Sequence, residues 1–363
     1  MWAMIVKEFR QVRRDRRTLA MMIVMPILLL VVLGYAASFD VKTITVVTAG
    51  PQASVVATAL RPPFDVTTTA PGQSASWARN QLRDGKAQVA IVTGGARPQV
   101  LIDGSQLFSA KAALAALARL RQNGPVSSPI LVPPKVTVLY NPGLKTSAIM
   151  IPGLCGVVLV FVGTIITSLG VVRERQSGTL EQLAVMPLKP RDVFLGKIVP
   201  YFLVAAVDLA IVLAIGIAIF GVPFRGNPAV FALGALLFLF VTLGIGVLIS
   251  SVSQNQGQAI QLAVMTLLPQ VLLSGLIFPL ASIAAGVRWI AYFLPLTYFN
   301  QISRGVMLRA EPLAALWQPF VFLALLGAIV VTGATLRFRS YLAPAARHHG
   351  PRRPAVEPQG AQA

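Results

Sequence analysis

Six apolar stretches limit what this chain can fold into, because each has the roughly twenty residues that a helix needs to cross a bilayer. They cover residues 19–39, 148–171, 198–220, 229–250, 259–279 and 316–336. Of the 363 residues, 55% are hydrophobic and only 12% are charged, about half the charged share of a soluble domain. The sequence therefore predicts an α-helical integral membrane protein with six transmembrane helices.

The net charge is +19, and much of the charge flanks these stretches, as expected for residues that meet lipid headgroups. Nothing in the sequence resembles a nucleic-acid-reading module. Arginines precede the first stretch and follow the last: Arg13, Arg14, Arg16, Arg17, Arg337 and Arg339. Because basic residues stay on the cytoplasmic side, we expect a multi-pass protein of the cell membrane with both termini in the cytoplasm.

The first 18 residues combine an apolar face with basic residues on the rest of the helical wheel. This pattern predicts an amphipathic helix at the cytoplasmic interface, followed by a transmembrane helix over residues 19–39. The alternative is the charged start of a cleaved signal peptide. The length of the apolar stretch favours the retained helix.

Residues 40–147 have a different composition, rich in Thr, Pro, Gly and Arg, and predict a small extracytoplasmic α/β domain. Strands are expected at residues 43–48, 89–93, 100–103 and 136–140. Helices are expected at 76–86 and 107–122, and a linker at 124–134. The basic residues of this long loop do not oppose an outside location.

Residues 148–336 then form a five-helix transmembrane domain. Within it, residues 280–310 are interrupted by Pro and Gly and are too polar for a full span. A re-entrant hairpin in the outer leaflet fits this stretch, and an ordinary outer loop fits it equally. Residues 337–363 predict a disordered basic cytoplasmic tail.

Residues 173–187 form a short charged piece between two apolar stretches. Leu180 and Leu183 recur at helical spacing with Glu181 on another side, and Pro187 would end the helix. This segment fits a helix that docks on a partner protein. A solvated loop at the membrane interface fits the same residues.

Asp208 lies near the middle of the third apolar stretch, where a carboxylate is costly unless it is neutral, paired or hydrated. It could line a translocation path and bind a cationic substrate. It could instead be a packing contact that bonds to Gln261 or Gln270 of a neighbouring span, and these two glutamines are further candidates for the path.

Small residues predict close helix packing at Gly153, Gly156, Gly163, Gly244 and Gly246. The hydroxyls of Thr164, Thr167 and Ser168 can bond across helices.

The sequence offers no catalytic or metal chemistry. A phosphate loop needs G-x-x-x-x-G-K-S/T, which residues 143–147 do not match. Cys155 is a single cysteine inside an apolar stretch, and His348 and His349 lie together in the tail. We therefore expect no enzyme activity, no cofactor and no metal in this chain, and any ATP would be hydrolysed on another subunit.

Several motifs resemble those of the ABC-2 type permeases, the membrane subunits of one class of ATP-driven exporters, in the subgroup with a large outer domain between the first two spans. They are YNPG at 140–143, RQSGTLEQL at 175–183, FGVPFRG at 220–226, LLSGLIFP at 272–279 and LPLTY at 294–298. The resemblance implies a coupling helix within residues 174–186 that docks into an ATPase subunit. Its expected contact residues are Glu174, Gly178, Thr179, Leu180, Glu181 and Leu183.

The resemblance also implies two permeases and two ATPases in the working unit, so a second permease copy or a paralogue is an expected partner. The predicted function is outward transport of a drug, lipid or other small amphipathic molecule by alternating access. Membrane lipid and a periplasmic or cell-wall protein are further expected partners, whereas nucleic acid is not. An ion-gradient-driven secondary transporter and a membrane-anchored receptor remain alternatives, although no inverted repeat typical of the former is visible.

Overall fold

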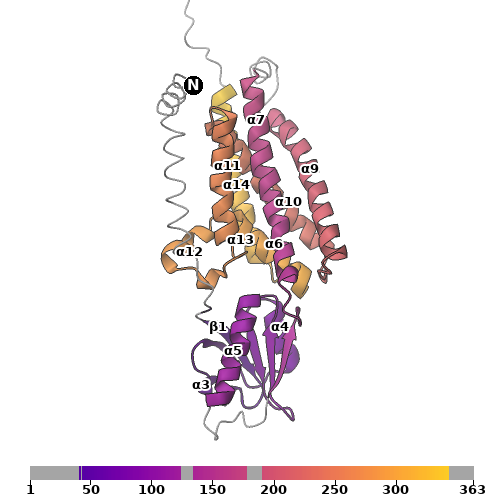
Figure 1. The fold of residues 1–363 in the computed structure, drawn as a ribbon, viewed down its shortest axis with the longest axis vertical. Helices are drawn as coiled ribbons and strands as arrows, with labels where there is room; N and C mark the ends of the chain where they lie inside the picture. Colours follow the sequence, from indigo (N-terminus) through magenta and orange to yellow (C-terminus); the bar gives the residue numbers. More distant parts are fainter. Residues whose placement is uncertain (1–40, 42, 124–133, 178–189, 343–363) are drawn as a thin grey trace, which may run out of the picture.

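The structure is a computed structural model that describes residues 41, 43–123, 134–177 and 190–342. An α/β domain lies at one end of a bundle of long helices (Figure 1). Several predicted segments lie outside the described residues: the interfacial helix, the first transmembrane helix, nearly all of the linker, most of the coupling stretch and residues 343–363 of the tail. The prediction that the disordered tail starts at residue 337 is wrong, because residues 337–342 are helical.

The α/β domain contains a five-stranded sheet in the order β2-β1-β3-β4-β5. The strands are β1 Ile44–Ala49, β2 Phe64–Ala70, β3 Val89–Val92, β4 Gln99–Asp103 and β5 Lys135–Leu139. Only β3 and β4 pair antiparallel; the other neighbours are parallel. The four predicted strands are confirmed, and β2 is a fifth that the sequence analysis did not predict.

Helices cover both faces of this sheet. Successive side chains of a strand point to opposite faces, and the strands place apolar side chains on both. Val46, Val89 and Ile102 pack with α3 (Ala53–Ala59) and α5 (Leu107–Asn123) on one face. On the other face, Val47 and Ala90 pack with α4 (Ala75–Arg83). The predicted α4 and α5 are confirmed, whereas α3 was not predicted.

The first described segment of the helical bundle consists of α6 (Thr146–Val160), the π-helical η1 (Phe161–Ile166) and α7 (Thr167–Gln176). The other long helices are α9 (Pro190–Ala218), α10 (Pro228–Val252), α11 (Gln256–Leu273) and α14 (Trp317–Leu342). Four described helical segments are long and apolar enough to cross a membrane: Thr146–Arg173, Pro200–Ala218, Pro228–Val252 and Trp317–Arg337. The predicted stretch at 259–279 falls on α11, which ends at Leu273 and contains several glutamines.

The centre of the bundle is α10, which packs against α14, α7, η1 and α13. Phe238 of α10 stacks on Phe299 of α13 with ring centroids 4.5 Å apart. By contrast, α9 presents apolar side chains such as Leu203, Val207 and Ile211 on its exposed face. An apolar surface of this extent is typical of a face that contacts lipid or another protein.

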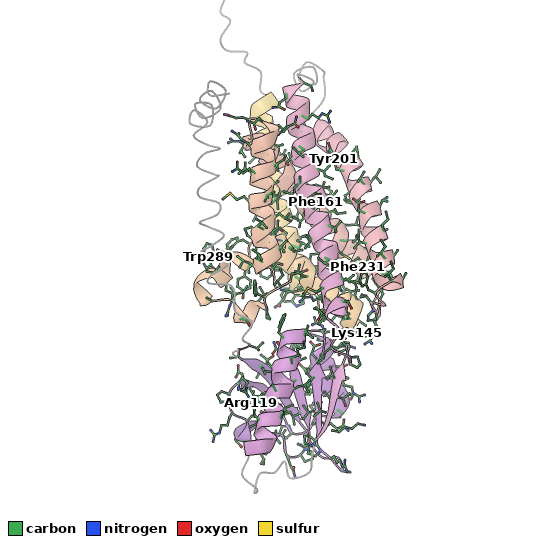
Figure 2. All side chains as sticks on the ribbon, viewed as in Figure 1. Arg119, Lys145, Phe161, Tyr201, Phe231 and Trp289 are labelled. Atoms are coloured by element: carbon green, nitrogen blue, oxygen red, sulfur yellow. The ribbon has the colours of Figure 1, made fainter. Side chains whose placement is uncertain are left out.

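Residues 280–310 form short helices: η2 (Leu280–Ser282), α12 (Ala285–Ala291), α13 (Pro295–Arg304) and the π-helical η3 (Gly305–Arg309). Most of α13 is buried against α6, α10 and α14. Exposed aromatic side chains gather around α12, where Trp289 lies at the periphery of the molecule (Figure 2) and is accompanied by Tyr292 and Phe293. Such residues are typical of a membrane–water interface.

A tight turn joins the sheet to the bundle. Asn141 binds Lys145 twice: its amide nitrogen donates to the Lys145 carbonyl, and its amide oxygen accepts from the Lys145 backbone N–H, each over 3.0 Å. Tyr140 and Leu144 adopt positive φ angles of 66° and 45° in this turn. Lys145 thus marks the passage from the sheet to α6 (Figure 2).

Candidate functional site

The described part of the predicted coupling stretch is the end of α7, which carries Glu174. The other predicted contact residues, Gly178, Thr179, Leu180, Glu181 and Leu183, lie outside the described residues. The end of α7 and the start of α9 both lie at the end of the bundle opposite the sheet (Figure 1). The predicted docking segment therefore leaves and re-enters the bundle at that end.

At the same end, α7 is attached to α11. The side-chain nitrogen of Gln256 donates a 3.0 Å hydrogen bond to the side-chain oxygen of Gln176. The two helices also pack together along part of their length. A displacement of the chain that follows α7 can thus reach α11 directly.

Asp208 is half-buried on α9, between the buried Ala205 on one side and the exposed Val204 and Ile211 on the other. It therefore lies at the border between the packed face of α9 and the exposed apolar row. No hydrogen bond or ion pair reaches its carboxylate from the residues that the structure describes.

The structure does not bring Asp208 together with Gln261 or Gln270. The helix that carries Asp208, α9, packs mainly against α6, α10 and α14, whereas both glutamines are on α11. Nine residues separate the two glutamines, which places them on opposite faces of the helix at 100° per residue. Accordingly, Gln261 is half-buried and Gln270 is fully buried.

Gln270 is a fully buried polar side chain. Neither its side-chain oxygen nor its side-chain nitrogen has a hydrogen-bond partner among the described residues. A buried amide without partners costs roughly 1–3 kcal/mol. An uncompensated polar group in a membrane domain indicates a functional position more often than a structural one.

Further polar side chains from α13 surround the turn that follows α11. Asn300 donates a 3.0 Å hydrogen bond to the hydroxyl of Ser274, one helical turn after Gln270. Arg304 donates to the carbonyl oxygens of Gly275 and Leu276 over 3.1 and 3.2 Å. Each of these two side chains still has one unpartnered polar atom among the described residues, Asn300 Oδ1 and Arg304 Nε.

The sequence analysis missed this cluster of Gln270, Ser274, Asn300 and Arg304. It identified Gln270, but it treated the other polar residues only as a reason why the segment could not span. The available signal was the four-residue spacing of Asn300 and Arg304, which puts both on one face of a helix.

The π-helical η1 and the start of α7 lie close to α10. A Cβ on Gly246 of α10 would lie 2.9 Å from Thr167 Cβ and would also meet the carbonyl oxygen of Gly163. The predicted close packing at the small residues is confirmed. The three hydroxyls make no bond across helices within the described residues: Thr164 and Thr167 have no partner there, and Ser168 donates to Ile165 of its own helical segment. A π-helical turn inside an α-helix is frequent at functional sites.

An apolar groove of about 570 Å³ opens between α9, α10 and α14. It is lined by Phe202, Leu233, Leu236, Leu237, Phe240, Phe320, Val321 and Ala324. Because this lining offers no hydrogen-bonding side chain, the groove can accept hydrocarbon but cannot recognise a charged group. No group of three metal-ligating side chains occurs in the part of the chain that the structure describes.

The sequence of this chain is similar to those of known membrane transport proteins. Residues 16–336 match the family described as ABC-2 family transporter protein. The chain is 29% identical over 334 residues to the probable multidrug ABC transporter permease YbhS of Escherichia coli, covering 85% of this chain and 88% of that protein.

Two further relatives come from the same organism. YbhR, also described as a probable multidrug ABC transporter permease, is 34% identical over 200 residues, 55% of this chain and 54% of the relative. The inner membrane transport permease YhhJ is 31% identical over 227 residues, 61% of this chain and 59% of the relative.

Proposed function

Because the chain belongs to the ABC-2 transporter family, we propose that it moves a substrate outward as the membrane permease subunit of an ATP-driven exporter. The chain carries no phosphate-binding loop, so ATP is hydrolysed on a separate ATP-binding cassette subunit. The permease crosses the cell membrane six times, with residues 19–39 and α11 added to the four long apolar segments. Both termini are cytoplasmic, and the α/β domain is outside.

The observation that supports a coupling mechanism is the Gln176–Gln256 hydrogen bond, which lies at the end of the bundle where the coupling stretch begins. Residues 174–186 dock on the ATPase, with Leu180 and Leu183 in an apolar cleft and Glu174 and Glu181 against basic groups. Closure of the ATPases displaces this segment, and the displacement reaches α7 and α11 together.

The substrate path lies between two permeases, either two copies of this chain or this chain and a paralogue. Asp208, Gln261 and Gln270 are assigned to this path as separate polar positions, because Asp208 is on α9 and the two glutamines occupy opposite faces of α11. The few polar side chains among many apolar ones fit a small amphipathic molecule, and the relatives' description as multidrug permeases supports the same class. The outer domain then meets a periplasmic or cell-wall partner.

The test is Glu181→Arg in proteoliposomes that contain the partner ATPase, with an amphipathic cationic dye as the probe. We expect basal ATPase activity and folding to persist, whereas dye transport and dye-stimulated ATPase activity fall about tenfold, which corresponds to about 1.4 kcal/mol. Glu357→Arg is the matched control, because it changes the charge equally in the tail. Unchanged stimulation in Glu181→Arg would remove the coupling role from this segment.

A further inference from the structure

The α/β domain touches the helical bundle through a buried group of charged side chains. Arg309, the last residue of η3, extends towards the end of β4, where Asp103 is fully buried. Its Nη1 lies 3.5 Å from Asp103 Oδ2 and donates a 3.2 Å hydrogen bond to the hydroxyl of Ser105. That hydroxyl in turn donates to Asp103 Oδ1 over 2.6 Å.

Glu311 holds the same guanidinium from the bundle side. Arg309 Nη2 lies 2.8 Å from Glu311 Oε1, and Arg309 Nε donates to the same oxygen over 3.1 Å. The solvent-exposed fractions of the side chains are 0% for Asp103, 10% for Arg309 and 3% for Glu311. The three residues, named here the junction triad, therefore form a contact between the two parts of the molecule that is closed to solvent.

The charges of the junction triad do not balance, because two carboxylates share one guanidinium. Other charged groups nearby do not correct this excess. Asp84, at the end of α4, is paired with Arg83 at 3.0 Å. Tyr140 is a neutral phenol, since burial and Asp103 raise its pKa to about 12. Arg304 is directed to the carbonyl oxygens of Gly275 and Leu276.

We propose that the junction triad is a proton-sensitive latch, which holds the α/β domain at a fixed position on the bundle when one carboxyl group is protonated. A single proton leaves one carboxylate for Arg309 and removes the uncompensated buried charge. Loss of that proton leaves one buried carboxylate in excess and weakens the contact.

The direction of the pKa values agrees with this arrangement. Burial raises the pKa of Asp103 above its ordinary value, against the lowering effect of Arg309. Burial also raises the pKa of Glu311, and Asp103 and Asp84 add to the increase, whereas Arg309 opposes it. A carboxyl group with a higher pKa in the joined state favours joining at low pH. That contribution is complete below the ordinary carboxyl pKa of about 4 and is lost as the pH rises through the higher value.

The experiment measures the distance between the two parts of the full chain in lipid nanodiscs. Fluorophores are attached at Ser54→Cys on α3 and at Ala314→Cys before α14, in a Cys155→Ala background. Both labelled positions are exposed, and α3 lies on the α/β domain away from the bundle (Figure 1). Labelled protein is diluted with unlabelled protein, so that each assembly carries one labelled chain.

We expect a narrow distance distribution at about pH 5 that broadens towards about pH 8.5. Asp103→Asn and Glu311→Gln each remove the excess charge, so each should give a narrow distribution throughout. The double variant leaves Arg309 buried without a carboxylate and should be broad at every pH. Asp65→Asn, on the exposed side of β2, is the matched control and should follow the unmodified protein.

Two results would overturn the latch. One is a distribution of equal width at every pH in the unmodified protein, which would leave the junction triad as a purely structural contact. The other is a single neutral variant that broadens with pH as the unmodified protein does. Neither measurement requires nucleotide, substrate or an ATPase, so the outcome is independent of the proposed transport function.

Discussion

The side chains of Gln176 and Gln256 join the last residue of α7 to the first residue of α11 through one hydrogen bond of 3.0 Å. Both side chains are exposed, so the bond contributes little to the stability of the fold. Its position matters more, because it is the point at which α11 can follow a movement of the segment after α7.

Replacing Gln256 with Ala should separate stability from coupling. An exposed hydrogen bond contributes about 1 kcal/mol or less, so the free energy of unfolding should change by no more than that. The amount of dye transported per ATP should fall about two- to threefold, because α11 follows α7 less closely. Proteoliposome transport and ATPase assays measure this ratio. Gln254→Ala, an exposed glutamine two residues earlier, should leave the ratio unchanged, and an equal loss in both variants would contradict the prediction.

Gln270→Met should stabilise the protein while it impairs transport. The apolar side chain has a similar volume and removes two buried polar atoms without partners, which should raise the free energy of unfolding by roughly 1–3 kcal/mol. Transport should fall if the amide serves substrate. Chemical denaturation in detergent and dye transport give the two values. Gln261→Met, at a half-buried position, should have a smaller effect on stability, and a destabilised Gln270→Met protein would show that the amide has a structural partner.

Gly246→Ala and Gly333→Ala should change stability in opposite directions, although both replace a helical glycine. The added methyl at Gly246 meets the backbone carbonyl of Gly163, which cannot move aside as a side chain could. We expect a loss of about 1–3 kcal/mol. At Gly333 the nearest atom is Leu248 Cδ2 at 3.8 Å, so the variant should gain up to about 1 kcal/mol from helix propensity. Thermal unfolding measures both, and equal shifts would refute the close contact between η1 and α10.

Asp208→Asn should distinguish a substrate contact from a packing contact. If the carboxylate binds a cationic substrate, transport of a cationic dye should fall about tenfold while its neutral analogue is transported normally. Asp65→Asn on the outer domain serves as the control for the loss of one negative charge. An equal loss for both dyes would reject cation binding and leave Asp208 as a packing residue.

Much of the α/β domain could be predicted because the buried strands alternate Val, Ile and Thr between two faces. The strand β2 escaped prediction because its sequence, FDVTTTA, has one buried residue, Phe64, and otherwise resembles an exposed loop. The helix α3 escaped because it has seven residues, no side-chain cap and buries only Ala53 and Val56. An edge strand and a short helix depend on neighbours that a local pattern does not contain.

The long apolar helices were equally predictable, since length and hydropathy define them locally. The polar cluster and the junction triad were not. Arg304 binds backbone carbonyls that any residue could provide, and they lie 29 and 28 positions away in the sequence. The bond from Arg309 to Ser105 spans 204 positions. The spacing of Asn300 and Arg304 indicates a shared helical face, but it does not indicate these partners, which only tertiary packing brings together. The predicted coupling helix at residues 174–186 stays a prediction.

The turn at Asn141 and Lys145 connects strand β5 to one continuous helical segment, the 28 residues from Thr146 to Arg173, which includes the π-helical η1 and is about 40 Å in length. The two Asn141–Lys145 hydrogen bonds hold this turn, so the strand follows the helix while the junction triad also holds the domain on the bundle. Axial rotation of this helical segment should therefore swing the edge of the sheet. A fluorescent label on the sheet, outside the cell, would then report each cycle of ATP hydrolysis in the cytoplasm.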